Sequence, residues 1–214
     1  MEKSLKNYDV LIIGAGPAGA NAAISYKNLN PKLTVGLVDK AIFPRDKSCG
    51  DAIGPGVISA LKRFNNEHIL DGEPQVVSTT LYGPDNIGIQ NYIPEVKNKE
   101  DSIVYVIPRV DLDNRILDLA KESGVDVYEG YSFVDFTSNL DKSLNVQIKN
   151  ENENLEFLTK ILVGADGANS RIRKKLNYKS NSDWHKAIAI SCLLYTSDAA
   201  DEGLGVDLGG RRII

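Results

Sequence analysis

The chain has 214 residues, of which 42% are hydrophobic and 25% charged, which fits a globular protein of one large domain or two small ones. Its formal net charge of −4 excludes a basic surface for nucleic acid. No apolar run approaches the length of a membrane span, and residues 1–10 lack the apolar core of a signal peptide. Two cysteines, Cys49 and Cys192, make neither a disulfide framework nor a metal cluster, so we expect a reducing cytoplasm.

A glycine-rich turn follows an apolar run near the start of the chain. Residues 10–13 are apolar, the glycines after them have the spacing G-x-G-x-x-G, and residues 18–26 are rich in alanine. This order predicts a buried strand, a tight turn and a helix whose first amide N–H groups meet the pyrophosphate of a dinucleotide. A glycine turn alone can simply reverse the chain, but the strand before it and the helix after it favour a nucleotide site. The residues expected there are Gly14, Gly16, Pro17, Ala18 and Gly19.

The second predicted strand covers residues 33–40 and ends at Asp39, 20 residues after Gly19. An acidic side chain at this place can accept hydrogen bonds from the ribose hydroxyls of an adenosine. A solvated aspartate at a strand end is the simpler alternative, and the preceding glycine turn makes it the less favoured one. We therefore expect Asp39 and the adjacent Lys40 at the cofactor, with residues 7–40 binding the ADP part of FAD or NAD.

The segment 41–64 begins as a polar loop and ends in a helix with apolar residues at Val57, Ile58, Leu61 and Phe64. Its sequence FPRDKSCGD, followed by Gly-Pro and a helix, resembles the second signature of the geranylgeranyl reductase family. That family consists of flavoproteins of the para-hydroxybenzoate hydroxylase-like FAD superfamily.

The resemblance implies that the loop residues Cys49, Gly50 and Asp51 lie beside the flavin. The Cys49 thiol is the candidate catalytic group, which could tune the flavin or relay a proton. Alternatively it is a small residue that lets the backbone pass close to the ring. Asp51 is alternatively a turn former.

Residues 65–108 alternate short strand-like runs with turns. Residues 76–93 predict a hairpin that turns through Gly83, Pro84, Asp85 and Asn86, at the start of a sheet that covers flavin and substrate. A strand and a helix follow between residues 105 and 125, with Asp111 as the expected N-cap and Gly124 as the stop. The expected apolar face of that helix consists of Leu112, Ile116, Leu119 and Ala120.

Two further positions follow from the family resemblance. Arg109 and Asp113 resemble its Arg-x-x-x-Asp element, in which the arginine reaches the FAD phosphates; a surface cation is the alternative for Arg109. Residues 125–128 predict a strand that returns to the nucleotide-binding sheet. After it, Val134 resembles the position whose backbone pairs with adenine.

A late aspartate-glycine turn completes the pattern. Residues 144–149 and 155–163 predict a β-hairpin, and its second strand leads into GADGANSRIR. This run resembles the Asp-Gly fingerprint of FAD-dependent hydroxylases and reductases. The resemblance places Asp166 and Gly167 near the FAD ribose and pyrophosphate, where they help to shape access for the reductant. The helix after the turn is expected to carry Ile172 and Leu176 inward.

The last residues resemble translated laboratory DNA. Residues 192–202, CLLYTSDAADE, match a transposase-type sequencing adapter, and residues 206–214, VDLGGRRII, match its flanking primer in the same frame. We therefore expect the natural sequence to be cut off near Ser191, inside the next sheet, with its continuation missing and with no function for Cys192, Tyr195 or the Arg211-Arg212 pair; a genuine strand and tail is the alternative. The superfamily's third FAD motif is then missing, so we expect the 214-residue polypeptide to bind FAD poorly and to be inactive.

The predicted fold class is α/β: a Rossmann-type FAD-binding domain with a parallel central sheet, a β-hairpin and part of an antiparallel substrate-domain sheet. The expected divisions are 1–64 for the βαβ unit and flavin loop, 65–108 for the start of the substrate sheet, 109–176 for the rest of the FAD-binding domain, 177–191 for the start of a truncated substrate domain, and 192–214 for the artefactual tail.

The resemblance implies an FAD-dependent oxidoreductase that reduces C=C bonds of geranylgeranyl or polyprenyl groups in lipids or quinones. NAD(P)H or a ferredoxin is the implied electron donor. An FAD-dependent hydroxylase, other monooxygenase or halogenase is the first alternative, and a non-catalytic nucleotide-binding fragment is the second. Lipid substrates imply peripheral contact with a membrane, although residues 1–191 show no amphipathic anchor. No metal and no nucleic acid are expected.

Overall fold

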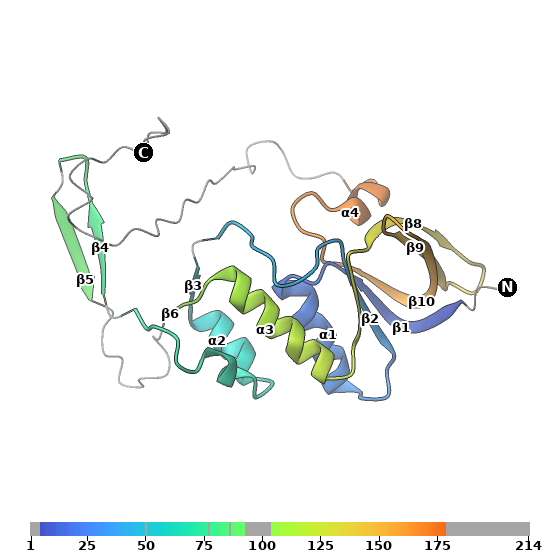
Figure 1. Cartoon of the computed structure of the whole chain (residues 1–214), viewed down its shortest axis with the longest axis horizontal. Helices are drawn as coiled ribbons and strands as arrows, with labels where there is room; N and C mark the ends of the chain where they lie inside the picture. Colours follow the sequence, from blue (N-terminus) through green and yellow to red (C-terminus); the bar gives the residue numbers. More distant parts are fainter. Residues whose placement is uncertain (1–4, 50, 77, 86, 93–103, 179–214) are drawn as a thin grey trace.

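A six-stranded sheet organises the fold (Figure 1). This computed structural model describes residues 5–49, 51–76, 78–85, 87–92 and 104–178. The strand order is β7-β2-β1-β10-β9-β8, in which the first four strands run parallel and the last two continue as an antiparallel extension. The strands are β1 (Lys6–Ile13), β2 (Val35–Asp39), β7 (Asp126–Glu129), β8 (Ser132–Ser138), β9 (Leu144–Lys149) and β10 (Asn154–Gly164). The predicted α/β class with a parallel central sheet is confirmed.

The predicted strand-turn-helix-strand unit is β1, α1 (Pro17–Leu29) and β2. Pro17 occupies the first turn of α1, where its missing N–H leaves no intrahelical bond unmade. Small residues, among them Ala20 and Ala23, form the buried face of α1 and let it approach the sheet closely. The helix packs beside α3 (Arg109–Glu122), and Figure 1 shows the two lying together against the sheet.

Both faces of the sheet are covered, as the continuous apolar run in β1 requires. Val10 and Ile12 face one core, which they share with α1 and α3. Leu11 and Ile13 face the other, which contains Phe157 of β10 and residues of β8 and β9. This burial on two sides fixes the carboxyl ends of the strands relative to one another.

The helix α3 differs from prediction at its start. Its N-cap is Pro108, and Asp111 lies in the first turn without making a side-chain cap, so the N-cap prediction is wrong. The helix begins earlier because an ion pair between Arg109 and Asp113, four residues apart, holds residues 109–113 in helical geometry. Gly124 ends α3 with a φ of +80°, as predicted. The predicted apolar face, Leu112, Ile116, Leu119 and Ala120, is buried.

The segment between β2 and α3 contains α2 (Pro55–Lys62) and a short 3-10 helix at Glu67–Leu70. Ile58 and Leu61 of α2 are buried as expected, whereas Val57 is exposed. The same part of the chain contains two small antiparallel pairs. They are β3 (Ala52–Ile53) with β6 (Tyr105–Val106), and β4 (Ser78–Tyr82) with β5 (Gly88–Tyr92). The second pair is the predicted hairpin, and it stands apart from the central sheet in Figure 1.

The predicted hairpin of β9 and β10 is confirmed, and a turn then leads into α4 (Arg171–Lys175). Ile172 is buried under the sheet, as expected. Leu176 is 62% exposed, so the prediction that it points inward is wrong. The reason is length: α4 ends at Lys175 and Leu176 is its C-cap, so no further turn brings this side chain back to the sheet.

Several expectations fall outside the described residues. They concern Gly50, Asn86, the substrate-domain start beyond residue 178, and the adapter-like tail with Cys192, Tyr195, Arg211 and Arg212. Among the residues that are described, no helix combines the length and apolar character needed to cross a membrane.

Candidate dinucleotide-binding site

A cleft of about 500 Å³ lies at the carboxyl ends of β1, β2 and β10. Parallel sheets of this kind bind their ligands at that edge. The cleft brings together six predicted residues: Gly14, Gly16, Asp39, Lys40, Asp166 and Gly167. Its polar lining also includes residues that the sequence did not single out: Arg45, Asp46, Lys47, Ser132, Asn169 and Arg171.

The three glycines of the turn serve two different purposes. Gly14 has a φ of +103°, and a Cβ there would lie 2.3 Å from the carbonyl oxygen of Ala165, at the end of β10. A Cβ on Gly19 would lie 1.7 Å from the carbonyl oxygen of Gly14, so both glycines allow close backbone packing. Gly16 instead faces the cleft, where the nearest group to such a Cβ is the Arg45 guanidinium at 3.4 Å.

The start of α1 opens onto this cleft. Gly16 is its N-cap residue and lines the cleft, while Pro17, Ala18 and Gly19 form the first turn and are not among the lining residues. The first amide N–H groups of a helix have no intrahelical acceptor and favour a negative charge. This part of the site can therefore hold a pyrophosphate beside Gly16.

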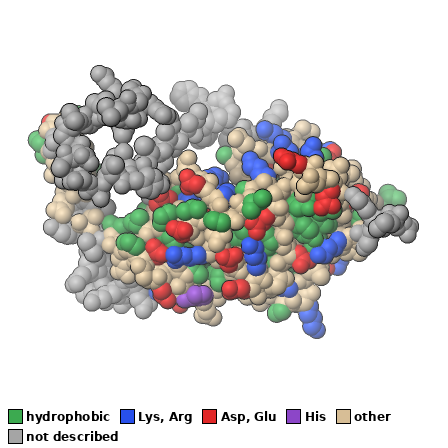
Figure 2. Space-filling model, in the orientation of Figure 1, with side chains coloured by type: hydrophobic (Ala, Val, Ile, Leu, Met, Phe, Trp, Pro, Cys, Tyr) green, Lys and Arg blue, Asp and Glu red, His purple; other side chains and the backbone are tan. Residues whose placement is uncertain are grey.

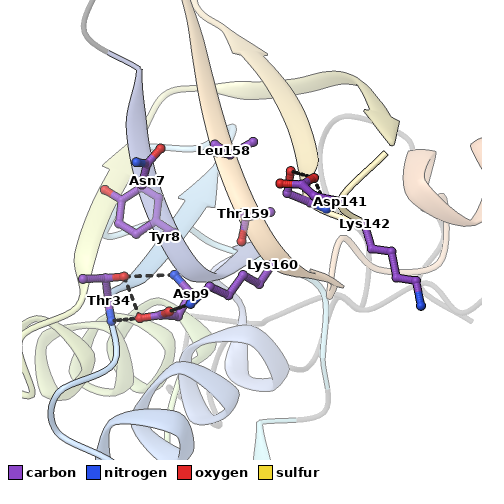
Figure 3. Close-up of a pocket in the computed structure, with 10 residues that line it drawn as sticks. Asn7, Tyr8, Asp9, Thr34, Asp141, Lys142, Leu158, Thr159 and Lys160 are labelled. Atoms are coloured by element: carbon purple, nitrogen blue, oxygen red, sulfur yellow. Dashed lines mark hydrogen bonds and ion pairs between the residues drawn. The ribbon is translucent and has the colours of Figure 1, made fainter. Parts of the chain in front are cut away.

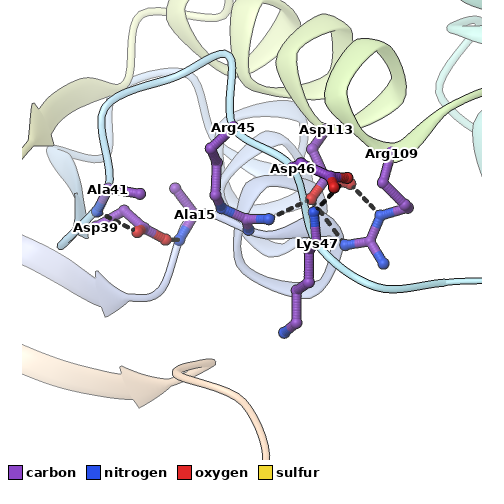
Figure 4. Close-up of polar contacts among 8 residues, drawn as sticks. All are labelled: Ala15, Asp39, Ala41, Arg45, Asp46, Lys47, Arg109 and Asp113. Atoms are coloured by element: carbon purple, nitrogen blue, oxygen red, sulfur yellow. Dashed lines mark hydrogen bonds and ion pairs between the residues drawn. The ribbon is translucent and has the colours of Figure 1, made fainter. Parts of the chain in front are cut away.

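Asp39 is held rigidly at the end of β2 (Figure 4). Its Oδ2 atom accepts a 2.7 Å hydrogen bond from the backbone N–H of Ala15, and its Oδ1 atom accepts one of 2.8 Å from that of Ala41. These two bonds fix the orientation of the carboxylate. Because a carboxylate has about four acceptor positions, it retains capacity for ribose hydroxyls.

A buried ion cluster supports the loop that follows β2 (Figure 4). Asp113 of α3 is fully buried, and Arg109 donates to both of its oxygens, from Nε at 2.6 Å and from Nη2 at 2.7 Å. Arg45 Nη1 lies 3.1 Å from Asp113 Oδ2, and the Arg45 guanidinium stacks on the Phe43 ring at 4.8 Å. Hydrogen bonding to Asp113 raises the pKa of Arg109, so the Arg109 guanidinium stays charged.

The two arginines lie differently from the sequence expectation. Arg109 is not among the residues that line the cleft, because its guanidinium is committed to Asp113. Arg45, from the other side of the same carboxylate, is the arginine that faces Gly16. Arg45 lies in the run FPRDK, a few residues after the predicted second strand. A single arginine in a polar loop follows no helix or strand periodicity, so the sequence did not single it out.

Cys49, Asp51 and Val134 stand outside the cleft lining. Cys49 is half-buried and its side chain hydrogen-bonds with Arg109, which also contributes to the raised pKa of Arg109. Asp51 has a φ of +52° and its carbonyl accepts from the N–H of Ile107, which fits a turn-forming role. Val134 lies at a register shift in β8, next to the lining residue Phe133.

The Asp-Gly turn contributes an acceptor without a partner. Asp166 Oδ2 accepts from the backbone N–H groups of Arg171 at 2.7 Å and Ile172 at 3.4 Å. Its Oδ1 atom is buried and has no hydrogen-bond partner within the part of the chain that is described. A buried acceptor of this kind requires a donor, and a hydroxyl group of a ligand in the cleft would supply one.

A second cleft, of about 570 Å³, lies at the opposite end of the parallel strands (Figure 3). Its polar groups bind one another: Asp9 accepts from Thr34 and from Lys160, whose bond is 2.8 Å long. Thr159 is buried there and donates to the carbonyl of Ile161. None of the predicted site residues lines this cleft, so the cleft at the carboxyl ends is the candidate site.

Comparisons with known proteins agree with the cofactor that this geometry indicates. Residues 7–197 match the family described as FAD binding domain. The chain is 29% identical over 178 residues to a menaquinone reductase of Mycolicibacterium smegmatis, with 83% of this chain and 41% of the relative covered. It is 26% identical over 176 residues to a digeranylgeranylglycerophospholipid reductase of Picrophilus torridus, with 81% and 43% covered. The chain thus spans less than half the length of these curated relatives.

Solved structures show the same fold. A p-nitrophenol 4-monooxygenase of Pseudomonas putida superposes with a TM-score of 0.71 at 14% identity, over 80% of this chain and 44% of that enzyme.

Proposed function

Because the chain belongs to the FAD binding domain family, we propose that its cleft holds FAD for an oxidoreductase that reduces C=C bonds of isoprenoid chains in lipids or quinones. The observation that carries the proposal is the meeting of three distant segments in one cleft. They are the glycine turn, the end of β2 and the Asp-Gly turn after β10. The finer assignment of substrate rests on the names of the two curated relatives and on the FPRDKSCGD loop.

The residues of the cleft fit FAD. The backbone at Gly16 leaves room for a pyrophosphate, and Asp39 offers acceptors to a ribose. The unpartnered Asp166 Oδ1 is placed to accept from a cofactor hydroxyl. Bound FAD would supply hydride-transfer chemistry, while the protein supplies binding, orientation and electrostatics.

Arg45 is the residue that we assign to the cofactor phosphates in place of Arg109. Its guanidinium lies next to Gly16, and the ion pair with Asp113 fixes its direction. Arg109 then acts through Asp113 as a positioning residue. A charge-assisted contact to phosphate contributes about 1.5–3 kcal/mol, enough to change FAD affinity by roughly ten- to a hundredfold.

An isolated C=C bond offers no carbonyl for the protein to polarise. A site for it must therefore exclude water and bind the chain through shape and apolar contact. Seven of the side chains that line the described cleft are charged, so it suits the nucleotide part of the cofactor better than an isoprenoid tail. We propose that the substrate binds outside this cleft, next to Cys49 in the loop that follows β2.

The test uses the full-length protein encoded by the natural reading frame that contains residues 1–191, purified with FAD. Under anaerobic conditions and with chemically reduced FAD, we expect menaquinone or a geranylgeranyl lipid to gain two hydrogens, read by mass spectrometry. Oxygen-dependent hydroxylation or halogenation instead would reject the reductase in favour of the alternatives. Failure of the protein to bind FAD by fluorescence titration would reject both.

A further inference from the structure

The short helix α4 and the residues after it form a basic surface beside the cofactor cleft. We define the α4 surface by its side chains: Arg171, Arg173, Lys174, Lys175, Leu176 and Tyr178. The segment 165–178 carries four cations and one carboxylate, in a chain whose formal net charge is −4. In Figure 2, Lys and Arg side chains gather at the upper right, where Figure 1 places α4. The local sign of charge is therefore opposite to that of the whole chain.

The carboxylates near this surface neutralise it only in part. Asp135 of β8 pairs with Lys175 at 2.7 Å, and Asp166 is turned toward the backbone of α4. Arg171 and Arg173 donate to backbone carbonyls, which carry no net charge. The Lys174 side chain is exposed and makes no ion pair or hydrogen bond within the described ranges, and the residue bonds only through its backbone. Three of the four cations thus have no carboxylate partner among the residues described.

Apolar side chains are exposed at the same place. Leu176 is 62% and Tyr178 is 74% exposed, and both follow directly after the cations. The charges alone would suit a soluble acidic protein as the partner. Adjacent cations, an exposed leucine and an exposed tyrosine together are what the interface of an anionic bilayer binds, because headgroups meet the charges and the acyl boundary meets the apolar groups.

We propose that the α4 surface docks this protein on an anionic lipid bilayer. The inference deepens the proposed function, since a lipid or quinone substrate resides in a bilayer. Each cation near an anionic surface strengthens binding by roughly fivefold. Immersion of a leucine side chain adds about a further tenfold.

The experiment measures binding of the full chain to phosphatidylcholine vesicles, with and without phosphatidylglycerol, by flotation. We expect binding to the anionic vesicles only, with loss at high salt. Lys174→Glu should weaken it about 25-fold, because one favourable charge is replaced by an unfavourable one. Leu176→Ser should weaken it roughly tenfold. The matched controls Lys32→Glu and Leu140→Ser change exposed residues on distant loops and should leave binding unchanged.

Absence of binding to anionic vesicles would overturn the proposal, and so would equal losses in the test and control variants. Vesicle binding that is insensitive to Leu176→Ser, with equal affinity for a soluble acidic protein such as a ferredoxin, would replace the bilayer by an acidic protein partner. The flotation assay measures docking and does not require catalytic turnover. A failed reductase assay therefore leaves the vesicle result readable, and failed docking leaves reduction of detergent-dissolved substrate testable.

Discussion

Asp113→Asn is expected to destabilise the protein severely although the side chain keeps its size. Asp113 is fully buried and compensates Arg109 and Arg45, whose side chains are only 15% and 19% exposed. Removing one partner of a buried ion pair costs about 3–5 kcal/mol, because the remaining charges are left uncompensated. Some solvent reaches both arginines, so we expect about 3 kcal/mol. For a domain of this size that loss lowers the melting temperature by roughly 6–12 °C.

The assay is urea unfolding followed by circular dichroism, with Asp111→Asn as the matched control. Asp111 lies on the same helix, is exposed and makes no side-chain cap. Its substitution removes only an interaction with the helix dipole, worth less than about 1 kcal/mol. If the two variants lose equal stability, the buried cluster is not what fixes the loop, and the assignment of Arg45 to the phosphates fails with it.

Three other substitutions test separate parts of the structure. Gly14→Ala should abolish FAD binding and lower the melting temperature because of its positive φ and backbone clash, whereas Gly56→Ala, with open space in α2, should be neutral or stabilising. Arg45→Met should weaken FAD binding roughly ten- to a hundredfold by fluorescence titration and leave the far-ultraviolet dichroism unchanged. The hydrogen bond from Lys160 lowers the pKa of Asp9 from 3.8 to about 2. This pair therefore stabilises the fold above about pH 4, and its contribution is lost as the pH falls toward 2. Asp9→Asn should reduce the loss of unfolding free energy between about pH 4 and 2 by less than about 1 kcal/mol, because the pair lies at the surface. An unchanged pH dependence would contradict the assignment.

The nucleotide half of the fold was predictable because its signals are local. Residues 7–40 combine an apolar run, a glycine spacing and an alanine-rich helix, and each of these acts within a few positions. The hairpin at β4 and β5 was predicted from its turn residues, and the return strand β7 was predicted at residues 125–128. The Asp-Gly turn lines the same cleft, and its position near the FAD ribose and pyrophosphate stays a prediction.

The remaining site residues depend on contacts that no local pattern encodes. Whether Arg45 or Arg109 faces the cleft is decided by which side of Asp113 each approaches, and that follows only from the packing of α3 against the loop. The inward orientation expected for Leu176 assumed one more helical turn than α4 has. The four cations of α4 lie within five consecutive residues of the sequence, but which of them has a carboxylate partner is decided by the fold.

The parallel pairing of β1 with β10 has a consequence for biosynthesis. Ile13 pairs with Gly164, so about 150 residues separate the two partners. At a typical elongation rate of about 5–20 residues per second, one edge of β1 stays unpaired for roughly 8–30 seconds until β10 has been synthesised. During that interval a strand that ends in four aliphatic residues presents unpaired amide and carbonyl groups to the solvent, which is the kind of edge that aggregates. Nascent chains of this protein should therefore depend on chaperones until synthesis has passed residue 164, and only then can a cofactor be captured.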